Sequence, residues 1–189
     1  TPAEVAIALA ETAAKWQGLS ISELANLPRM TAAHPLAIMR LLSIIMPVCY
    51  QGMPELFPLI VSKAVNLSIE YGNTEQSPFA YALQGLFLCG AMEIETGYQF
   101  GQLTLQVLEQ LNVQVQRARA LQVVNGFINP WKEHLSISSQ RLKEAYQIAR
   151  EEGDLEYVGY SSLTHCEYAY FSGQSLFGLE PIQASYIQV

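Results

Sequence analysis

Charged side chains are scarce in this sequence of 189 residues. They make up 14% of the chain, against roughly 25% in a typical soluble domain. Lysine and arginine together number 10 and the formal net charge is −7, with no basic cluster denser than Arg117 and Arg119. Because nucleic-acid binding requires a concentrated basic surface, the sequence argues against a nucleic-acid partner. Hydrophobic residues reach 50%, and this excess predicts apolar surface that neighbouring modules cover.

Paired cysteines and long apolar runs are also lacking. Cys49, Cys89 and Cys166 lie far apart and form no CxxC pair, so we interpret them as reduced, mostly buried thiols of a cytoplasmic protein. A membrane span needs about 20 uninterrupted apolar residues. The longest apolar stretch, residues 37–50, is interrupted by Arg40 and Pro47. We therefore expect no membrane span.

The motifs of common enzymes are missing as well. There is no GxSxG, no HExxH, no paired-carboxylate motif and no glycine-rich dinucleotide loop. Residues 85–90 have the glycine spacing of a phosphate loop, but Ala91 and Met92 replace its lysine and hydroxyl residue, so packing inside a buried helix is favoured. His165, Cys166 and Glu167 are consecutive and, on a helix, point about 100° apart, so they cannot converge on one metal ion. We expect no catalytic residue, cofactor or metal in this chain.

What the sequence does contain is a recurring helix end. Amphipathic segments stop at Gly72, Leu111 and Gly153, which lie about 40 residues apart, and after each stop an apolar segment precedes a more polar one. A period of this length with two helices per unit is typical of an α-solenoid. The sequence therefore predicts an all-α fold, a right-handed solenoid of antiparallel helix pairs with degenerate repeats resembling tetratricopeptide (TPR) repeats.

This pattern also predicts the organisation of the chain. N-terminal helices (residues 1–34) lead in from a preceding module, and a helical-repeat domain (residues 35–189) follows. Its units cover residues 35–73, 74–112, 113–154 and 155–189, and the last unit looks incomplete. Helices are expected over residues 2–17, from Ser20 to before Pro28 with Ser20 or Ser22 as the cap, and from 35 to near Pro47 or a little beyond. Further helices are expected over 54–71, 77–92, 95–111, 113–127, 133–152 and 155–171.

Several glycines fall inside these expected helices, where each costs about 1 kcal/mol relative to alanine. Close contact between helices is the natural compensation at Gly85, Gly101 and Gly159. Gly97 and Gly101 form a small-xxx-small pair, which we expect to let a neighbouring helix approach.

An aromatic cluster near the C-terminal end is the strongest candidate for an interaction patch. Tyr157, Tyr160 and Tyr168 share one side of an expected helix, and tyrosines that bury their rings near water suit an interface or a ligand groove. Trp131 and His134, at the start of the polar helix, complete the candidate interaction patch. Ordinary packing between repeats is the alternative for the tyrosines, and a capping or surface role is the alternative for His134.

Five stretches, in their order and spacing, resemble a known family: MRLL (39–42), PLIVSKAVNLS (58–68), GYQFG (97–101), WKEHL (131–135) and GDLEY (153–157). They are similar to one region of very large signalling proteins that are common in cyanobacteria. Those proteins join a serine/threonine kinase, an AAA/STAND-type ATP-binding module, a long helical region, a GAF sensor and a histidine kinase. The resemblance covers nearly the whole chain and places it in the helical region just after the ATPase.

The resemblance implies a non-catalytic scaffold or sensor-relay module of a cytoplasmic signal-transduction kinase. Its partners would be the neighbouring ATPase and GAF or kinase domains of the same chain, other signalling proteins, or a second copy. The kinase lysine, the phosphate loop and the phosphoacceptor histidine of that family match no position here. The alternative is a small-molecule receptor whose pocket is lined by Tyr157, Tyr160 and Tyr168.

Overall fold

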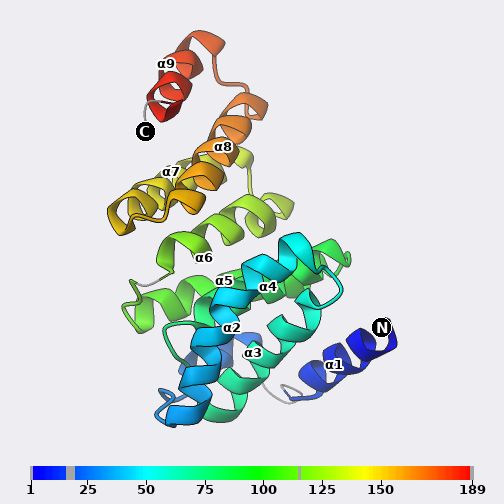
Figure 1. The fold of residues 1–189 in the computed structure, drawn as a ribbon. Coiled ribbons are helices and arrows are strands. Elements are labelled where there is room, and N and C mark those ends of the chain that lie inside the picture. Colours follow the sequence, from blue (N-terminus) through cyan, green and yellow to red (C-terminus); the bar gives the residue numbers. More distant parts are fainter. Residues whose placement is uncertain (1, 16–19, 115, 188–189) are drawn as a thin grey trace. The chain divides into compact units, whose positions relative to one another are not determined.

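The computed structural model describes residues 2–15, 20–114 and 116–187, and every regular element in these ranges is helical (Figure 1). Pairing of the β type is limited there to an isolated parallel bridge between Arg29 and Asn73. The chain divides into two compact units, Thr1–Gln116 and Arg117–Val189. The predicted all-α class is confirmed for the described residues. The solenoid, its TPR-like repeats and the domain limits at residues 34 and 35 stay predictions.

The first unit is built from consecutive helices that pack as neighbours. α3 contacts α1, α2 and α4, and α4 forms the most extensive pair with α5. Its largest buried side chains include Tyr81, Phe79 and Phe100, which come from α4 and α5. The elements are α1 (Pro2–Lys15), the 3₁₀-helix η1 (Ile21–Asn26), α2 (Ala33–Gly52), α3 (Phe57–Tyr71), α4 (Ser77–Gly90) and α5 (Ile94–Gln110).

The second unit centres on the pair α7 and α8, which share the most extensive contact of this unit. Leu142, Ala145 and Ala149 of α7 are fully buried, and Ile128 and Ala169 join them in the core. The elements are α6 (Arg117–Val123), the π-helical turn η2 (Val124–Ile128), the 3₁₀ turn η3 (Asn129–Trp131), α7 (Leu135–Glu152), α8 (Leu155–Phe171) and α9 (Leu176–Ile187).

All three predicted helix ends are confirmed. Gly72, Leu111 and Gly153 directly follow α3, α5 and α7. Gly153 has the left-handed backbone typical of a helix C-terminus, with φ of 73°, and its N–H donates to the carbonyl of Arg150. Gly72 has φ of 101°, and a Cβ atom there would lie 2.2 Å from the carbonyl oxygen of Pro28. The backbone at Gly153 therefore favours glycine, and the collision at Gly72 requires it.

The starts of two helices differ in how well the sequence predicts them. Of the two candidate caps, Ser20 is the N-cap of η1, and its backbone N–H donates to the Glu23 carboxylate at 2.6 Å in a capping box. The helix expected from residue 113 begins only at Arg117, because Asn112 and Gln116 adopt φ values of 49° and 63°, outside the helical region. Residues 16–17 and the last two residues of the chain lie outside the described ranges.

The helices α2 and α4 test two other expectations. α2 runs through Pro47 and ends only at Gly52, although Pro47 cannot donate a backbone hydrogen bond. Residues 85–90 belong to α4, so they form no loop around a phosphate, and the alternative of a buried helix is confirmed.

The helical glycines are not equivalent. A Cβ atom at Gly97 would lie 2.9 Å from the carbonyl oxygen of Gly85 and 2.5 Å from Cys89 Sγ, so α5 approaches α4 closely there, as predicted. A Cβ atom at Gly159 of α8 would meet no atom within 4 Å. The predicted compensation by close helix contact is therefore wrong for Gly159.

This difference predicts that alanine at Gly97 and alanine at Gly159 change the free energy of unfolding in opposite directions. We expect Gly97→Ala to lower the free energy of unfolding by about 1–3 kcal/mol, because backbone atoms of α4 must move. Gly159→Ala should instead raise it by about 0.5–1 kcal/mol, because alanine is the better helix former and no neighbour obstructs it. Urea denaturation followed by circular dichroism measures both values. A stabilising Gly97→Ala would show that the α4–α5 contact is looser than described.

Candidate functional site

The candidate site is the surface of α2, a helix that is apolar nearly all round. Its only basic residues are His34 and Arg40, and it contains no acidic residue. One side, which we call the core face, is buried against the rest of the first unit and includes Met39, Met46 and Cys49. Helices of this kind are normally enclosed on all sides, because exposed apolar surface is unfavourable in water.

The opposite side of α2 is exposed. Leu41, Ile44 and Val48 are 60%, 66% and 57% exposed, and Ile45 beside them is also exposed. Their spacing of three and four residues places them in one stripe along the helix. We call these four residues the outer face of α2. Contiguous exposed apolar patches typically mark protein or membrane contacts.

By length and composition alone, α2 could also cross a membrane. That property is shared by core helices of soluble proteins, and the core face of α2 packs against α3 and α4. The expectation that the chain has no membrane span stays a prediction.

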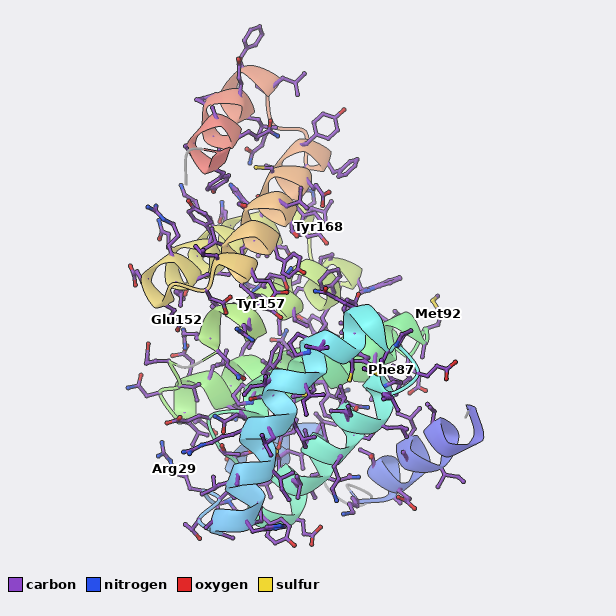
Figure 2. The ribbon with its side chains drawn as sticks, in the orientation of Figure 1. Arg29, Phe87, Met92, Glu152, Tyr157 and Tyr168 are labelled. Carbon is purple, nitrogen blue, oxygen red and sulfur yellow. The ribbon has the colours of Figure 1, made fainter. Side chains whose placement is uncertain are left out.

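An apolar cleft lies at the C-terminal end of α2. Its volume is about 410 Å³, and its walls are Tyr50, Pro54, Phe57, Leu86, Phe87, Gly90 and Ala91. Tyr50 and Phe57 meet edge to face, with their ring centres 5.2 Å apart. Met92 projects outward close to Phe87 (Figure 2) and is largely exposed. We call this the α2–α4 cleft; it can take an apolar side chain or small molecule.

The predicted tyrosine patch in the second unit is largely used for packing. Tyr157 is buried, with the Arg119 guanidinium 5.0 Å from its ring centre, and Arg119 Nε lies 2.6 Å from Asp154 Oδ2. Burial raises the pKa of the Tyr157 hydroxyl. Burial and the nearby Asp154 carboxylate raise the pKa of Glu152, while Arg119 opposes them. These contacts tie the turn between α7 and α8 to α6.

The other two tyrosines point their hydroxyls at partners within the unit. Tyr168 donates a hydrogen bond to the carbonyl oxygen of Gly126 in η2, and Tyr160 donates to Glu156 at 3.2 Å. The Tyr157 and Tyr160 rings meet edge to face at 5.5 Å. This geometry favours the alternative of ordinary packing; a role of the three tyrosines in binding stays a prediction.

Trp131 and His134 both precede the first residue of α7. Trp131 ends η3 and is half-exposed. His134 is the N-cap of α7, since its Nδ1 atom accepts a hydrogen bond from the backbone N–H of Ser136 at 3.2 Å. The capping alternative for His134 is therefore confirmed. Its part in an interaction patch, like that of Trp131, stays a prediction.

His165 is buried and joins α8 to α7. Its Nδ1 lies 2.7 Å from the carbonyl oxygen of Ser139 and 3.0 Å from Ser139 Oγ, while Ser139 Oγ donates to the His165 carbonyl at 3.3 Å. An Nδ1–H that donates to the Ser139 carbonyl cannot serve as a base for the serine hydroxyl. The pair is thus a cross-link between two helices, not a nucleophile and its base.

The cysteines and acidic residues form no reactive site in the described ranges. Cys49 and Cys89 are free and buried, as predicted, and Cys166 is free and half-buried. Burial raises the pKa of the Cys89 and Cys166 thiols, which opposes formation of the nucleophilic thiolate. No group of three or more potential metal ligands occurs among the described residues.

The outer face of α2 was missed by sequence reasoning. Among the apolar residues of this helix, Ile45 is exposed, whereas Met39 and Met46 are buried. A second stripe through Leu41, Ile44 and Val48 was already present in the sequence. It indicates a helix that is apolar on both sides, although it does not say which side the fold covers.

Comparisons with known proteins give one weak similarity. No protein-family model and no solved structure matches the chain. Among curated proteins, 128 residues are 27% identical to a protein of Dictyostelium discoideum, "Hybrid signal transduction histidine kinase G". The match covers 66% of this chain but 4% of that kinase. The similarity supports a signal-transduction kinase context. TPR-like repeats and a cyanobacterial origin stay predictions.

The His165 cross-link predicts a pH dependence of stability. Burial lowers the pKa of His165 from the usual 6.5, with nearby Lys143 acting in the same direction and the Ser139 hydrogen bond opposing. The unfolded chain therefore binds the proton more tightly, so stability is lost as the pH falls below about 6.5. We expect His165→Asn, which keeps a donor near the Nδ1 position but does not titrate, to lose less stability between pH 7 and 5.

Urea denaturation at several pH values measures this difference. The matched control is His34→Asn, because His34 is exposed, and it should keep the pH dependence of the natural chain. Identical pH dependence in His165→Asn and the natural chain would contradict the prediction.

Proposed function

We propose that this chain is a non-catalytic helical module of a multidomain signalling kinase that acts by binding other domains or proteins. The main evidence for this proposal is the outer face of α2, an exposed apolar stripe on a helix whose core face is packed against the rest of the unit. The kinase context is supported by the weak similarity to the histidine kinase. The family resemblance suggests that the bound domain is the ATP-binding module of the same protein.

Physical chemistry favours a protein occupant for this surface. Leu41, Ile44 and Val48 present branched side chains at the spacing that a second helix recognises. The α2–α4 cleft beyond the end of the stripe offers a pocket for an anchoring side chain, and such pockets carry much of the energy of protein interfaces. A scaffold would hold its partner constantly, whereas a sensor relay would bind it in one nucleotide state.

A calorimetric titration distinguishes these roles. The chain is titrated with the separately expressed segment that precedes it in its parent protein, with and without ATP. We expect saturable binding that Ile44→Asp weakens at least tenfold, because a carboxylate would be desolvated in an apolar contact. Binding only with ATP, or only without it, would indicate a relay, and binding in both states would indicate a scaffold.

The control for Ile44→Asp is Leu163→Asp, which places the same charge at an exposed position of α8 in the other unit. It should leave binding unchanged. Equal binding by the natural chain and Ile44→Asp would show that the outer face is not the contact, and no binding by either would contradict the proposed function.

A small-molecule receptor is the second candidate, and the α2–α4 cleft favours it over the tyrosine patch. The cleft has the volume of a ligand site, about 410 Å³, and an apolar, partly aromatic lining. We expect the dye anilinonaphthalene sulfonate to gain fluorescence on binding there, and Gly90→Leu to reduce the gain by filling the cleft. A Cβ atom at Gly90 meets no atom within 4 Å, so the variant should fold.

Gly52→Leu is the matched control, because Gly52 is equally unobstructed and does not line the cleft. Ile44→Asp reports dye bound to the outer face of α2. An unchanged signal in Gly90→Leu would exclude the cleft as the dye site.

A further inference from the structure

A polar pocket of about 170 Å³ lies at the other end of α2, beside its first turns. Three segments of the first unit that are far apart in sequence form its walls. They are the connector before α2, the start of α2, and the turn between α3 and α4, with Leu111 at one edge. The lining residues are Arg29, Met30, Leu36, Arg40, Asn73, Thr74, Glu75, Gln76 and Leu111. Figure 2 labels Arg29 at this end and Phe87 near the opposite end.

The wall formed by Asn73 is rigid. Its backbone N–H donates to the Pro28 carbonyl at 2.7 Å, and its own carbonyl accepts from the N–H of Met30 at 2.9 Å. Its side-chain amide donates to the Leu24 carbonyl and accepts from the Tyr81 hydroxyl, both at 2.8 Å. The pocket is therefore preformed, because the backbone on both sides of Arg29 is held by these bonds.

Gln76 directs an unused donor into the pocket. Its side-chain oxygen accepts from the Thr74 hydroxyl at 2.6 Å, so its NH₂ group is the end left over. Gln76 is only 7% exposed, and the NH₂ group has no hydrogen-bond partner among the described residues. Its nitrogen is not fully enclosed, so it can donate to a ligand or water at the pocket.

Two guanidinium groups add positive charge to the same pocket. Arg29 donates one N–H to the Leu111 carbonyl at 3.1 Å, which fixes its position, and its other guanidinium N–H groups have no partner among the described residues. The guanidinium group of Arg40 makes no hydrogen bond or ion pair with any described residue. Glu75 is the single acidic residue of the lining, and it is exposed and forms no ion pair with either arginine in the described part of the chain. The polar groups of the pocket that lack a partner among the described residues are therefore mainly hydrogen-bond donors.

We propose that this pocket binds the oxyanion group of a small ligand, a phosphate or a carboxylate. Two guanidinium groups and an amide N–H₂ group supply donors that match such an anion, and guanidinium groups bind it through paired hydrogen bonds. The positive pair is conspicuous in a chain with a net charge of −7. This inference is independent of the proposed partner contact. Arg40 lies on the helix that carries the outer face, so an anion would contact the same element.

The test uses inorganic phosphate and acetate as probes, titrated into the chain at constant ionic strength set with sodium chloride. Binding is followed by the rise in melting temperature and by nuclear magnetic resonance shifts. We expect saturable binding of at least one anion, because a ligand that binds only the folded state stabilises it. Phosphate as the tighter ligand would assign a phosphate-bearing molecule, and acetate a carboxylate. No saturable binding of either would overturn the proposal.

Three single substitutions locate the site. Arg40→Gln should weaken binding about tenfold or more without loss of stability, because this guanidinium has no partner in the described chain. Glu75→Gln should tighten binding severalfold by removing the opposing charge. Gln76→Glu should abolish binding while keeping the side-chain shape. The control Arg150→Gln removes an arginine of α7 and should leave binding unchanged.

The Arg150→Gln control distinguishes a specific anion-binding site from general electrostatic attraction of anions to the chain. Equal weakening by Arg40→Gln and Arg150→Gln would mean that anions respond only to net charge, and would overturn the proposal. Weaker anion binding by Glu75→Gln than by the natural chain would also overturn the proposal, because removal of a negative charge from an anion site should strengthen binding.

Discussion

The hydrogen bonds of Asn73 hold the first unit together at one point. Its backbone and side chain bond to Leu24, Pro28, Met30 and Tyr81, so η1, the connector, the α3–α4 turn and α4 meet there. The neighbouring Gly72 allows this approach, since a side chain would collide with the Pro28 carbonyl. Leu24, Met30, Asn73 and Tyr81 are buried, where an unmatched amide or carbonyl costs far more than a solvated one. The positions of Arg29 and Gln76, and hence the polar pocket, follow from this arrangement.

The second unit uses polar groups differently. Arg119 bridges Asp154 and the Tyr157 ring, Tyr168 bonds to η2, and His165 joins α8 to Ser139 of α7. Each contact satisfies a group that the packing of helices would otherwise bury without a partner. Side chains that resembled an interaction patch therefore contribute to cohesion within this unit. Function is better sought where polar or apolar groups lack partners.

α2 is the element where such groups concentrate. It contributes Met39 and Met46 to the core, the outer face to solvent, Arg40 to the polar pocket and Tyr50 to the α2–α4 cleft. A helix that is packed on one side moves as part of its unit, so ligands at its ends and a partner along it would act on the same rigid body. This arrangement supports the proposal of a binding module in a signalling protein. The similarity to the histidine kinase supports the same context.

The sequence by itself determined the helical class and the ends of α3, α5 and α7, because helix periodicity and the backbone preferences of glycine are local properties. Whether the sequence contains a known enzyme motif is also decided by the sequence itself, because such motifs are short patterns of residue types. Only the tertiary structure decided which side of α2 is covered, where the tyrosine hydroxyls bond, and that Arg29, Arg40 and Gln76 share one pocket. Burial and polar partners depend on contacts between segments distant along the chain, and a pattern of residue types does not specify those contacts.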